Sequence, residues 1–159
     1  MRLTDQHFWN IVFTAFFLVL IFLGSIILEG EAGTRMRELS RMEYLILALA
    51  TFRFTRLVVY DKITAFFREQ FFNVVETKQG FELVKPDDGP RRTLADLLSC
   101  PWCFGVWASA TVIFFYLLTP YAYFPILVLA LGGVGSLLQI LANLIGWKAE
   151  QLKQDVERM

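Results

Sequence analysis

Long uncharged runs of apolar residues are the main feature of the hydrophobic and polar pattern along this chain. The first run covers residues 8–28, and only mildly polar side chains interrupt it. The second covers residues 97–147 and contains no Asp, Glu, Lys, Arg or His. A bilayer-spanning helix needs about 20 apolar residues, so one helix over the second run would be more than twice too long. We therefore predict one transmembrane helix in the first run and a helical hairpin in the second.

The ends of these runs define the expected helices. Pro120 and Pro125 mark the hairpin turn, with one helix at about residues 101–118 and the other at about 125–147. A secretory signal peptide is the alternative interpretation of the first run. Its apolar region is normally shorter and ends at a small-residue cleavage site, whereas this run ends in Leu28-Glu29-Gly30. We therefore expect a retained membrane anchor.

A fourth hydrophobic segment, residues 44–60, carries Arg53 and Arg56. Each central arginine costs about 2.5–3.5 kcal/mol on insertion scales, so insertion of this segment alone is marginal. An interfacial helix would need one continuous polar side, yet Leu49 and Phe52 lie in the same angular sector as the arginines. The pattern therefore favours a fourth span whose arginines reach toward one end.

The distribution of Lys and Arg gives an orientation for this topology. With four spans and a cytoplasmic N-terminus, ten of the 15 basic residues lie inside, and Arg35, Arg37 and Arg41 lie outside. A three-span arrangement with residues 29–96 inside places fourteen basic residues inside and one outside. Both arrangements put the uncharged loop 119–124 outside, so charge alone does not choose between them.

The segment between the second span and the hairpin, about residues 62–98, is the main polar part. Apolar residues at 71–75 and 81–84 flank Lys78-Gln79-Gly80, which predicts a short β-hairpin with its turn at the glycine. Thr93 followed by Asp96 resembles the N-cap signal of a short helix that leads to the membrane.

Composition supports a membrane protein and excludes other classes. Of the 159 residues, 56% are hydrophobic and 16% aromatic, more than a soluble domain of this size can bury. The 15 basic and 15 acidic residues cancel, so no electrostatic argument supports binding to nucleic acid. The lipid bilayer is therefore the first expected partner.

Cys100-Pro101-Trp102-Cys103 holds both cysteines of the chain. At a helix start the two sulfurs face the same side, and the helix dipole favours the thiolate of Cys100, as in dithiol oxidoreductases. A structural pair is the first interpretation, because the predicted cytoplasmic side is reducing and the chain has no second dithiol. A redox pair and a metal site shared with another subunit, to which His7 could add a ligand, stay open.

Arg53 and Arg56 lie one turn apart and therefore on one face of the predicted helix. They are candidates, with Asp61, for binding an anion or a lipid phosphate, or for lining a conduction path. The simpler interpretation is that they extend toward the interface and form ion pairs with Asp61 or Asp96.

A third set of polar and small residues follows one face of the last predicted span. Its members are spaced by four, three and four residues, and a matching small pair lies on the preceding span. Packing between helices is the default explanation for such residues, ahead of a pore lining, so we expect the hairpin helices to cross tightly there. The set comprises Gly132, Ser136, Gln139 and Asn143, and the pair is Gly105 and Ser109.

Two motifs carry a resemblance to a known family. They are residues 47–63, LALATFRFTRLVVYDKI, and residues 100–107, CPWCFGVW. The chain resembles domain of unknown function 1360, a family of small bacterial and phage membrane proteins, some of which are labelled sporulation proteins. The resemblance covers about residues 42–147 and implies no activity. It places the family motifs on Arg53, Arg56, Asp61, Cys100, Cys103 and Trp107, while the N-terminal span is one that many members lack.

Together these features predict an all-α integral membrane protein with four transmembrane helices and a small cytoplasmic β-hairpin insert. Residues 1–41 form an extra N-terminal helix and external loop. Residues 42–147 form the family-like core with the insert at about 62–98, and residues 148–159 form a charged cytoplasmic tail. We expect it in the bacterial inner membrane with both termini cytoplasmic.

The expected function is that of a structural or interaction component of this membrane, self-associated or bound to another membrane protein. The chain has no nucleotide-binding loop, and its single histidine cannot complete a Ser/His/Asp set, so catalysis is the weaker class. No cofactor or metal is expected. The alternatives are a membrane dithiol oxidoreductase that uses Cys100 and Cys103, and a small channel or anionic-lipid-binding protein.

Overall fold

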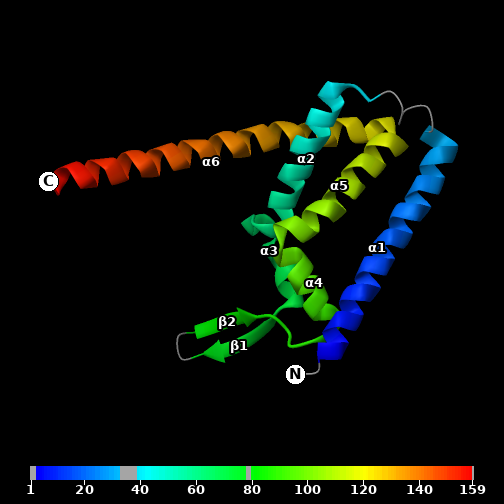
Figure 1. Cartoon of the computed structure of the whole chain (residues 1–159), viewed down its shortest axis with the longest axis horizontal. Helices are drawn as coiled ribbons and strands as arrows, with labels where there is room; N and C mark the ends of the chain where they lie inside the picture. Colours follow the sequence, from blue (N-terminus) through cyan, green and yellow to red (C-terminus); the bar gives the residue numbers. More distant parts are fainter. Residues whose placement is uncertain (1–2, 33–38, 78–79, 159) are drawn as a thin grey trace.

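The computed structural model describes residues 3–32, 39–77 and 80–158. These residues form helices and one two-stranded antiparallel hairpin (Figure 1). In chain order the elements are α1 (Leu3–Ala32), α2 (Arg41–Val59), η2 (Lys62–Thr64), α3 (Ala65–Arg68), η3 (Glu69–Phe71), β1 (Asn73–Thr77), β2 (Gly80–Val84), α4 (Gly89–Ser99), α5 (Pro101–Leu118), η4 (Pro120–Ala122) and α6 (Tyr123–Glu157).

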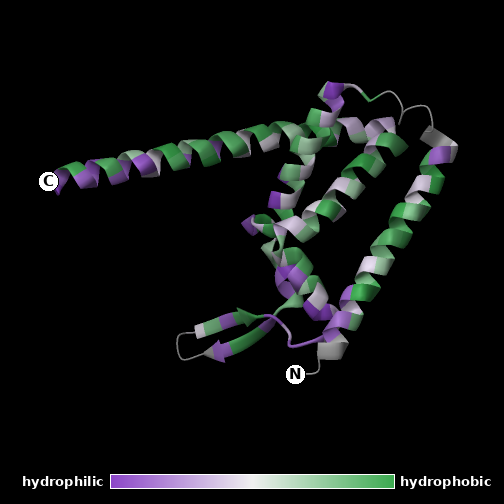
Figure 2. Ribbon diagram, in the orientation of Figure 1, coloured by the Kyte–Doolittle hydropathy of each residue, from purple (hydrophilic) through white to green (hydrophobic). Residues whose placement is uncertain are grey.

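Three helical segments of the described chain are long and apolar enough to cross a membrane: Gln6–Gly30, Pro101–Leu118 and Pro120–Glu157. Figure 2 shows hydrophobic residues along most of α1 and α5 and along much of α6, whereas α4 and the far end of α6 are more hydrophilic. A membrane location is compatible with these helices. The helix α2 is not among the three, because it carries four charged residues, Arg41, Glu43, Arg53 and Arg56. Its crossing of the membrane stays a prediction.

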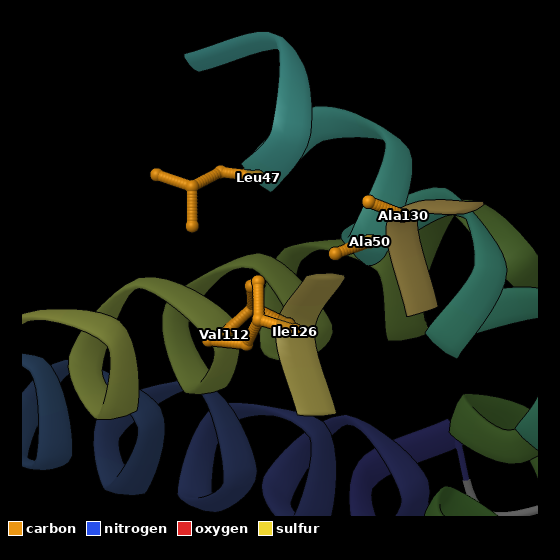
Figure 3. Close-up of a cluster of buried hydrophobic side chains, with 5 residues drawn as sticks. All are labelled: Leu47, Ala50, Val112, Ile126 and Ala130. Atoms are coloured by element: carbon orange, nitrogen blue, oxygen red, sulfur yellow. The ribbon is translucent and has the colours of Figure 1, made fainter. Parts of the chain in front are cut away.

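The core of the bundle lies where α2 packs against both α5 and α6. Leu47 and Ala50 of α2 meet Val112 of α5 and Ile126 and Ala130 of α6 (Figure 3), and all five are buried. Small side chains at two of these positions let the helix backbones approach closely. The centre of the bundle is therefore α2, which is also the most polar of its long helices.

The two helices of the expected hairpin separate after their connection instead of packing along each other. The turn η4 links α5 to α6, and α6 then crosses α2 and leaves the bundle sideways (Figure 1). The expectation of a tight crossing between α5 and α6 was therefore wrong. Gly133 gives the physical reason: it is buried against the backbone of Leu49, so α6 approaches α2 more closely than a side chain would permit.

The helix α1 is held at both of its ends. Near its N-terminus, Gln6 Nε2 donates a hydrogen bond of 2.8 Å to Thr93 Oγ1 of α4, and the Thr93 hydroxyl donates to Asn10 Oδ1 at 3.2 Å. Near its C-terminus, Leu28 is buried with Leu117 of α5. These two attachments place α1 alongside both α4 and α5.

The insert contains the β-hairpin that the sequence predicts. Asn73 pairs with Val84 at one end of the ladder and Thr77 pairs with Gly80 at the other. Lys78 and Gln79 of the predicted turn lie outside the described residues, as do Arg35 and Arg37 of the predicted external loop. The hairpin is exposed on both faces, so it contributes little to the core.

Two helix boundaries differ from the sequence predictions. Thr93 is not an N-cap: α4 begins at Gly89, after Asp88, because Pro90 favours the first turn of a helix. The last helix also extends further than predicted: α6 continues to Glu157, beyond the expected end of the span at residue 147. Ser40, which the sequence analysis missed, forms a capping box with Glu43 at the start of α2.

Candidate functional site

Arg53 of α2 contacts Asp61, which follows the end of this helix, and Gly132 of α6. Its Nη2 lies 2.7 Å from Asp61 Oδ2, and both side chains are 26% exposed. The stem of Arg53 lies across Gly132 of α6, where an added Cβ would be 3.5 Å from its Cγ. Of the two carboxylates expected to pair with the arginines, Asp61 pairs with Arg53, so the charge of this guanidinium is already balanced.

The end of α2 beside this ion pair is capped by the following segment. Arg68 Nη1 donates hydrogen bonds to the carbonyl oxygens of Val58 at 2.9 Å and Val59 at 2.7 Å. The Thr64 hydroxyl donates to the carbonyl of Leu57. A cation at a helix C-terminus also interacts favourably with the helix dipole. The sequence analysis missed this arrangement, because neither residue forms a local capping motif with α2.

Arg56 lies in a different environment from Arg53. Its guanidinium carbon is 5.9 Å from the ring centre of Phe52 and 5.3 Å from that of Tyr60. Within the described part of the chain it forms no ion pair. Contacts with aromatic rings accommodate a cation without neutralising it. Arg56 is therefore the arginine of this pair that keeps a charge to offer to an anion.

The two cysteines meet at the start of α5. Cys100 is its N-cap, and Cys100 Sγ accepts a hydrogen bond of 3.3 Å from the Cys103 backbone N–H. Cys103 Sγ donates to Cys100 Sγ at 2.6 Å, and both thiols are free. The hydrogen bond from the Cys103 thiol, then that from its backbone N–H, lowers the pKa of Cys100, and the positive charge of Lys85 adds to this. Cys100 is thus the thiol that ionises more readily than usual.

An open-sided cavity of about 450 Å³ lies next to these thiols, and we call it the thiol pocket. Residues from α1, α4 and α5, together with Lys85, line it. Its lining residues are Asn10, Phe13, Thr14, Phe17, Lys85, Thr93, Asp96, Leu97, Ser99, Cys100, Cys103 and Trp107. The thiols therefore face a space in which a small molecule fits.

One carboxylate joins two cations at the wall of the thiol pocket. Lys85 Nζ lies 2.8 Å from Asp96 Oδ1, and Arg92 Nε lies 2.9 Å from Asp96 Oδ2. Burial alone would raise the pKa of Asp96, but the hydrogen bonds and charges of Lys85 and Arg92 outweigh it and lower the pKa. At neutral pH the three groups carry one net positive charge. The i,i+4 spacing of Arg92 and Asp96 was a signal for this pair that the sequence analysis missed.

A metal site shared by the thiols and His7 has no local support. His7 is exposed and is not among the residues that line the thiol pocket. Among residues 3–32, 39–77 and 80–158, no group of three or more His, Cys, Asp or Glu side chains could hold a metal ion.

In the structure, the small and polar residues predicted to pack the last span do not share one helix contact. Gly132 lies against Arg53, and the Ser136 hydroxyl donates to the carbonyl of Gly132 at 2.9 Å. Gln139 and Asn143 are exposed, and their side chains hydrogen-bond to each other at 3.0 Å. On α5, Gly105 faces Thr55 of α2, and Ser109 is exposed and donates to the carbonyl of Val106. Gly105 and Ser109 thus lie apart from α6.

Two curated proteins of Bacillus subtilis (strain 168) are similar to this chain. UPF0713 protein YngL is 32% identical over 105 residues, which cover 65% of this chain and 81% of the relative. Sporulation protein YjcA is 35% identical over 104 residues, which cover 62% of this chain and 88% of the relative. No solved structure matches the chain.

The family model for DUF1360, described as "Protein of unknown function", matches residues 46–142. The match includes Arg53, Asp61 and both cysteines, but α1 lies outside it, so one wall of the thiol pocket comes from a helix beyond the matched region. The resemblance based on the two sequence motifs is confirmed. The chain belongs to the DUF1360 family.

Proposed function

We propose that this chain is a four-span protein of the bacterial inner membrane that acts as a structural or interaction component and associates with a second copy through α6. In this arrangement both termini and the insert at residues 62–98 are cytoplasmic. The exposed apolar half of α6 and its pair of amide side chains carry the proposal.

The position of α2 supports its crossing of the membrane. It has 19 residues and packs against α5, which has 18 and runs in the opposite direction over a similar height (Figure 1). A 19-residue helix is about 28 Å long, close to the hydrocarbon thickness of a bilayer. Arg53 is paired with Asp61 and Arg56 lies against aromatic rings, which lowers the cost of insertion. If α5 crosses the bilayer, α2 therefore crosses beside it, and α6 completes the four spans by turning from its sideways course in Figure 1 toward the direction of α5.

Cysteine labelling tests this topology in cells. In a chain with both native cysteines replaced by serine, Arg41→Cys at the start of α2 is expected to react with an impermeant thiol reagent added outside. Asp87→Cys, in the insert, is the control and is expected to react only after the membrane is permeabilised. Protection of Arg41→Cys under conditions that label an established external site would contradict four spans with this orientation.

The C-terminal part of α6 has few contacts within the chain. Residues 137–157 are all exposed, and a Cβ at Gly135 or Gly146 would meet nothing within 4 Å. The amides of Gln139 and Asn143 bond to each other, and within the described residues no other side chain pairs with them. Amide groups in hydrocarbon favour partners on another helix, and glycines leave room for its approach. A second copy offers the same amides and glycines in return, which is the pattern of a symmetric interface.

Removing the two amides tests self-association. The double variant Gln139→Leu, Asn143→Leu is expected to weaken the dimer at least about tenfold, because interhelical hydrogen bonds in membranes contribute roughly 0.6–2 kcal/mol each. Förster transfer between labelled copies in lipid vesicles, at varied protein-to-lipid ratios, measures this. Gln151→Leu, Gln154→Leu is the matched control, since water can satisfy amides in the charged tail. A monomeric parent chain, or equal association of both double variants, would refute the proposal.

A second candidate function is that of a membrane dithiol oxidoreductase. The observation that favours it is the pair of free thiols, whose sulfurs lie 2.6 Å apart at the wall of the thiol pocket. The lowered pKa of Cys100 favours its thiolate as the attacking group of the pair. Such a pair would cycle between a dithiol and a disulfide.

A further inference from the structure

A second cavity adjoins the thiol pocket. It is a groove of about 520 Å³ between α1 and α5, and we call it the apolar groove. The groove and the thiol pocket share two lining residues, Phe17 and Trp107, whose ring centres are 4.6 Å apart. Of its 15 lining residues, 13 are apolar or glycine, and the exceptions are Ser25 and Thr111.

The attachments of α1 explain why a groove lies there. Hydrogen bonds to Thr93 hold one end of the helix, and the Leu28–Leu117 contact holds the other. The groove lies between these attachments, along two helices that are apolar enough to span a membrane. The thiol pocket lies at the N-terminal end of α5, where that apolar stretch begins. The thiol pocket, with its mixed polar and apolar lining, thus adjoins an apolar groove that runs along helices able to span a membrane.

We propose that the thiol pocket and the apolar groove together bind an isoprenoid quinone, with its ring beside Cys100 and Cys103 and its tail in the groove, and that the two thiols reduce it. This inference rests on the second candidate function, that of a dithiol oxidoreductase, and names its electron acceptor. The ligand chemistry matches the two parts of the site: a ring that accepts electrons near the thiols, and a hydrocarbon tail against apolar side chains.

The reaction balances with the groups in place. The Cys100 thiolate adds to a ring carbon, forming a C–S bond and moving an electron pair onto a quinone oxygen. Cys103 sulfur then attacks Cys100 sulfur, so the S–S bond forms while the C–S bond breaks and its electron pair returns to the ring. The two thiol protons finish on the two oxygens. One dithiol and one quinone yield one disulfide and one hydroquinone.

The thiols distinguish a quinone from a phospholipid as the occupant. The net positive charge of Lys85, Arg92 and Asp96 would suit a lipid phosphate as well as an oxygen that gains electron density. A phospholipid, however, makes no chemical use of two sulfurs 2.6 Å apart. A quinone uses the pocket, the groove and the dithiol at once.

The first experiment tests the dithiol without a quinone. The full chain in lipid nanodiscs is equilibrated in glutathione buffers of increasing oxidation, and its free thiols are counted by mass spectrometry after alkylation. A reversible loss of two thiols is expected. If no disulfide forms under any buffer, both the dithiol function and the quinone proposal are wrong.

The second experiment adds the acceptor to the reduced protein. A ubiquinone with an isoprenoid tail is expected to lose its oxidised absorbance in step with the loss of two thiols, one quinone per chain. Cys100→Ser and Cys103→Ser should each abolish this reaction. If the dithiol cycles in glutathione but reduces no quinone, the dithiol function stands and the quinone proposal falls.

The third experiment tests the apolar groove. Ala110→Phe places a ring in the groove, and Ala48→Phe, on an exposed site of α2, is the matched control. The measured quantity is the rate of reduction of the tailed quinone divided by that of duroquinone, which has no tail. This ratio is expected to fall about tenfold from the parent chain to Ala110→Phe and to stay unchanged in Ala48→Phe. Variants are compared once their circular dichroism matches the parent. An unchanged ratio in Ala110→Phe, or a phospholipid adduct in native mass spectra that the tailed quinone does not displace, would overturn the assignment.

Discussion

Replacing Gly133 with alanine is expected to destabilise the protein more than any other single-methyl addition on α6. An added Cβ would lie 2.5 Å from the carbonyl oxygen of Leu49 and 3.2 Å from its carbonyl carbon. Both atoms belong to the backbone of α2, so relief requires the two helices to move apart. We expect a net loss of about 1–3 kcal/mol in the free energy of unfolding, because the cost of the clash outweighs the roughly 1 kcal/mol that alanine gains in helix propensity.

Gly135→Ala is the matched control for this prediction. It adds the same methyl group two residues further along α6, where a Cβ meets nothing within 4 Å. Stability there is expected to stay equal or rise by up to about 1 kcal/mol. Unfolding followed by circular dichroism in detergent measures both variants. Equal stability of Gly133→Ala and Gly135→Ala would show that the close approach of α6 to Leu49 is absent in the native protein.

The second large effect is expected from the ion pair of Arg53 and Asp61. Asp61→Asn leaves a partly buried guanidinium without its carboxylate, and the stem of Arg53 is confined by Gly132. Both side chains are 26% exposed, so this salt bridge is intermediate between a surface salt bridge and a fully buried one. We therefore expect Asp61→Asn to lower the free energy of unfolding by about 1–3 kcal/mol.

A double-mutant cycle isolates this interaction. Arg53→Gln and Asp61→Asn are combined, and a coupling energy of about 1–2 kcal/mol is expected, because each group's charge balances the other. Arg56→Gln provides the control: its guanidinium contacts rings, so its effect should add to that of Asp61→Asn without coupling. A coupling for Arg56 as large as that for Arg53 would mean that Asp61 serves both arginines.

Most elements of this chain follow from local sequence patterns. The helix at residues 101–118 was predicted with the bounds that α5 has, because Pro101 begins it and Thr119-Pro120 ends it. The β-hairpin was predicted from apolar residues on either side of a turn. The error at Thr93 shows the limit of such signals: its hydroxyl bonds to Gln6 and Asn10, 87 and 83 residues away. A residue that satisfies a local motif can equally serve a distant partner.

For the candidate sites too, local spacing predicted some features and only the structure revealed others. Spacing along one helix was enough to place Arg53 and Arg56 on a common face and to bring two thiols together at a helix start. It did not show that Arg53 would be neutralised while Arg56 would lie against two rings. The sequence did not predict the thiol pocket or the apolar groove, since their walls come from helices that are distant in the chain, among them α1, α4 and α5.

The sequence by itself thus determined the apolar helices, the hairpin, the dithiol and the family, because each depends on residues close together along the chain. Only the tertiary structure decided that α6 packs on α2, with Gly133 against Leu49, rather than on its neighbour α5. The physical reason is that apolar helices are nearly interchangeable in composition, so hydrophobicity alone does not select their partners. The choice depends on where backbones can approach within van der Waals contact and where a charge such as that of Arg53 finds its counter-ion.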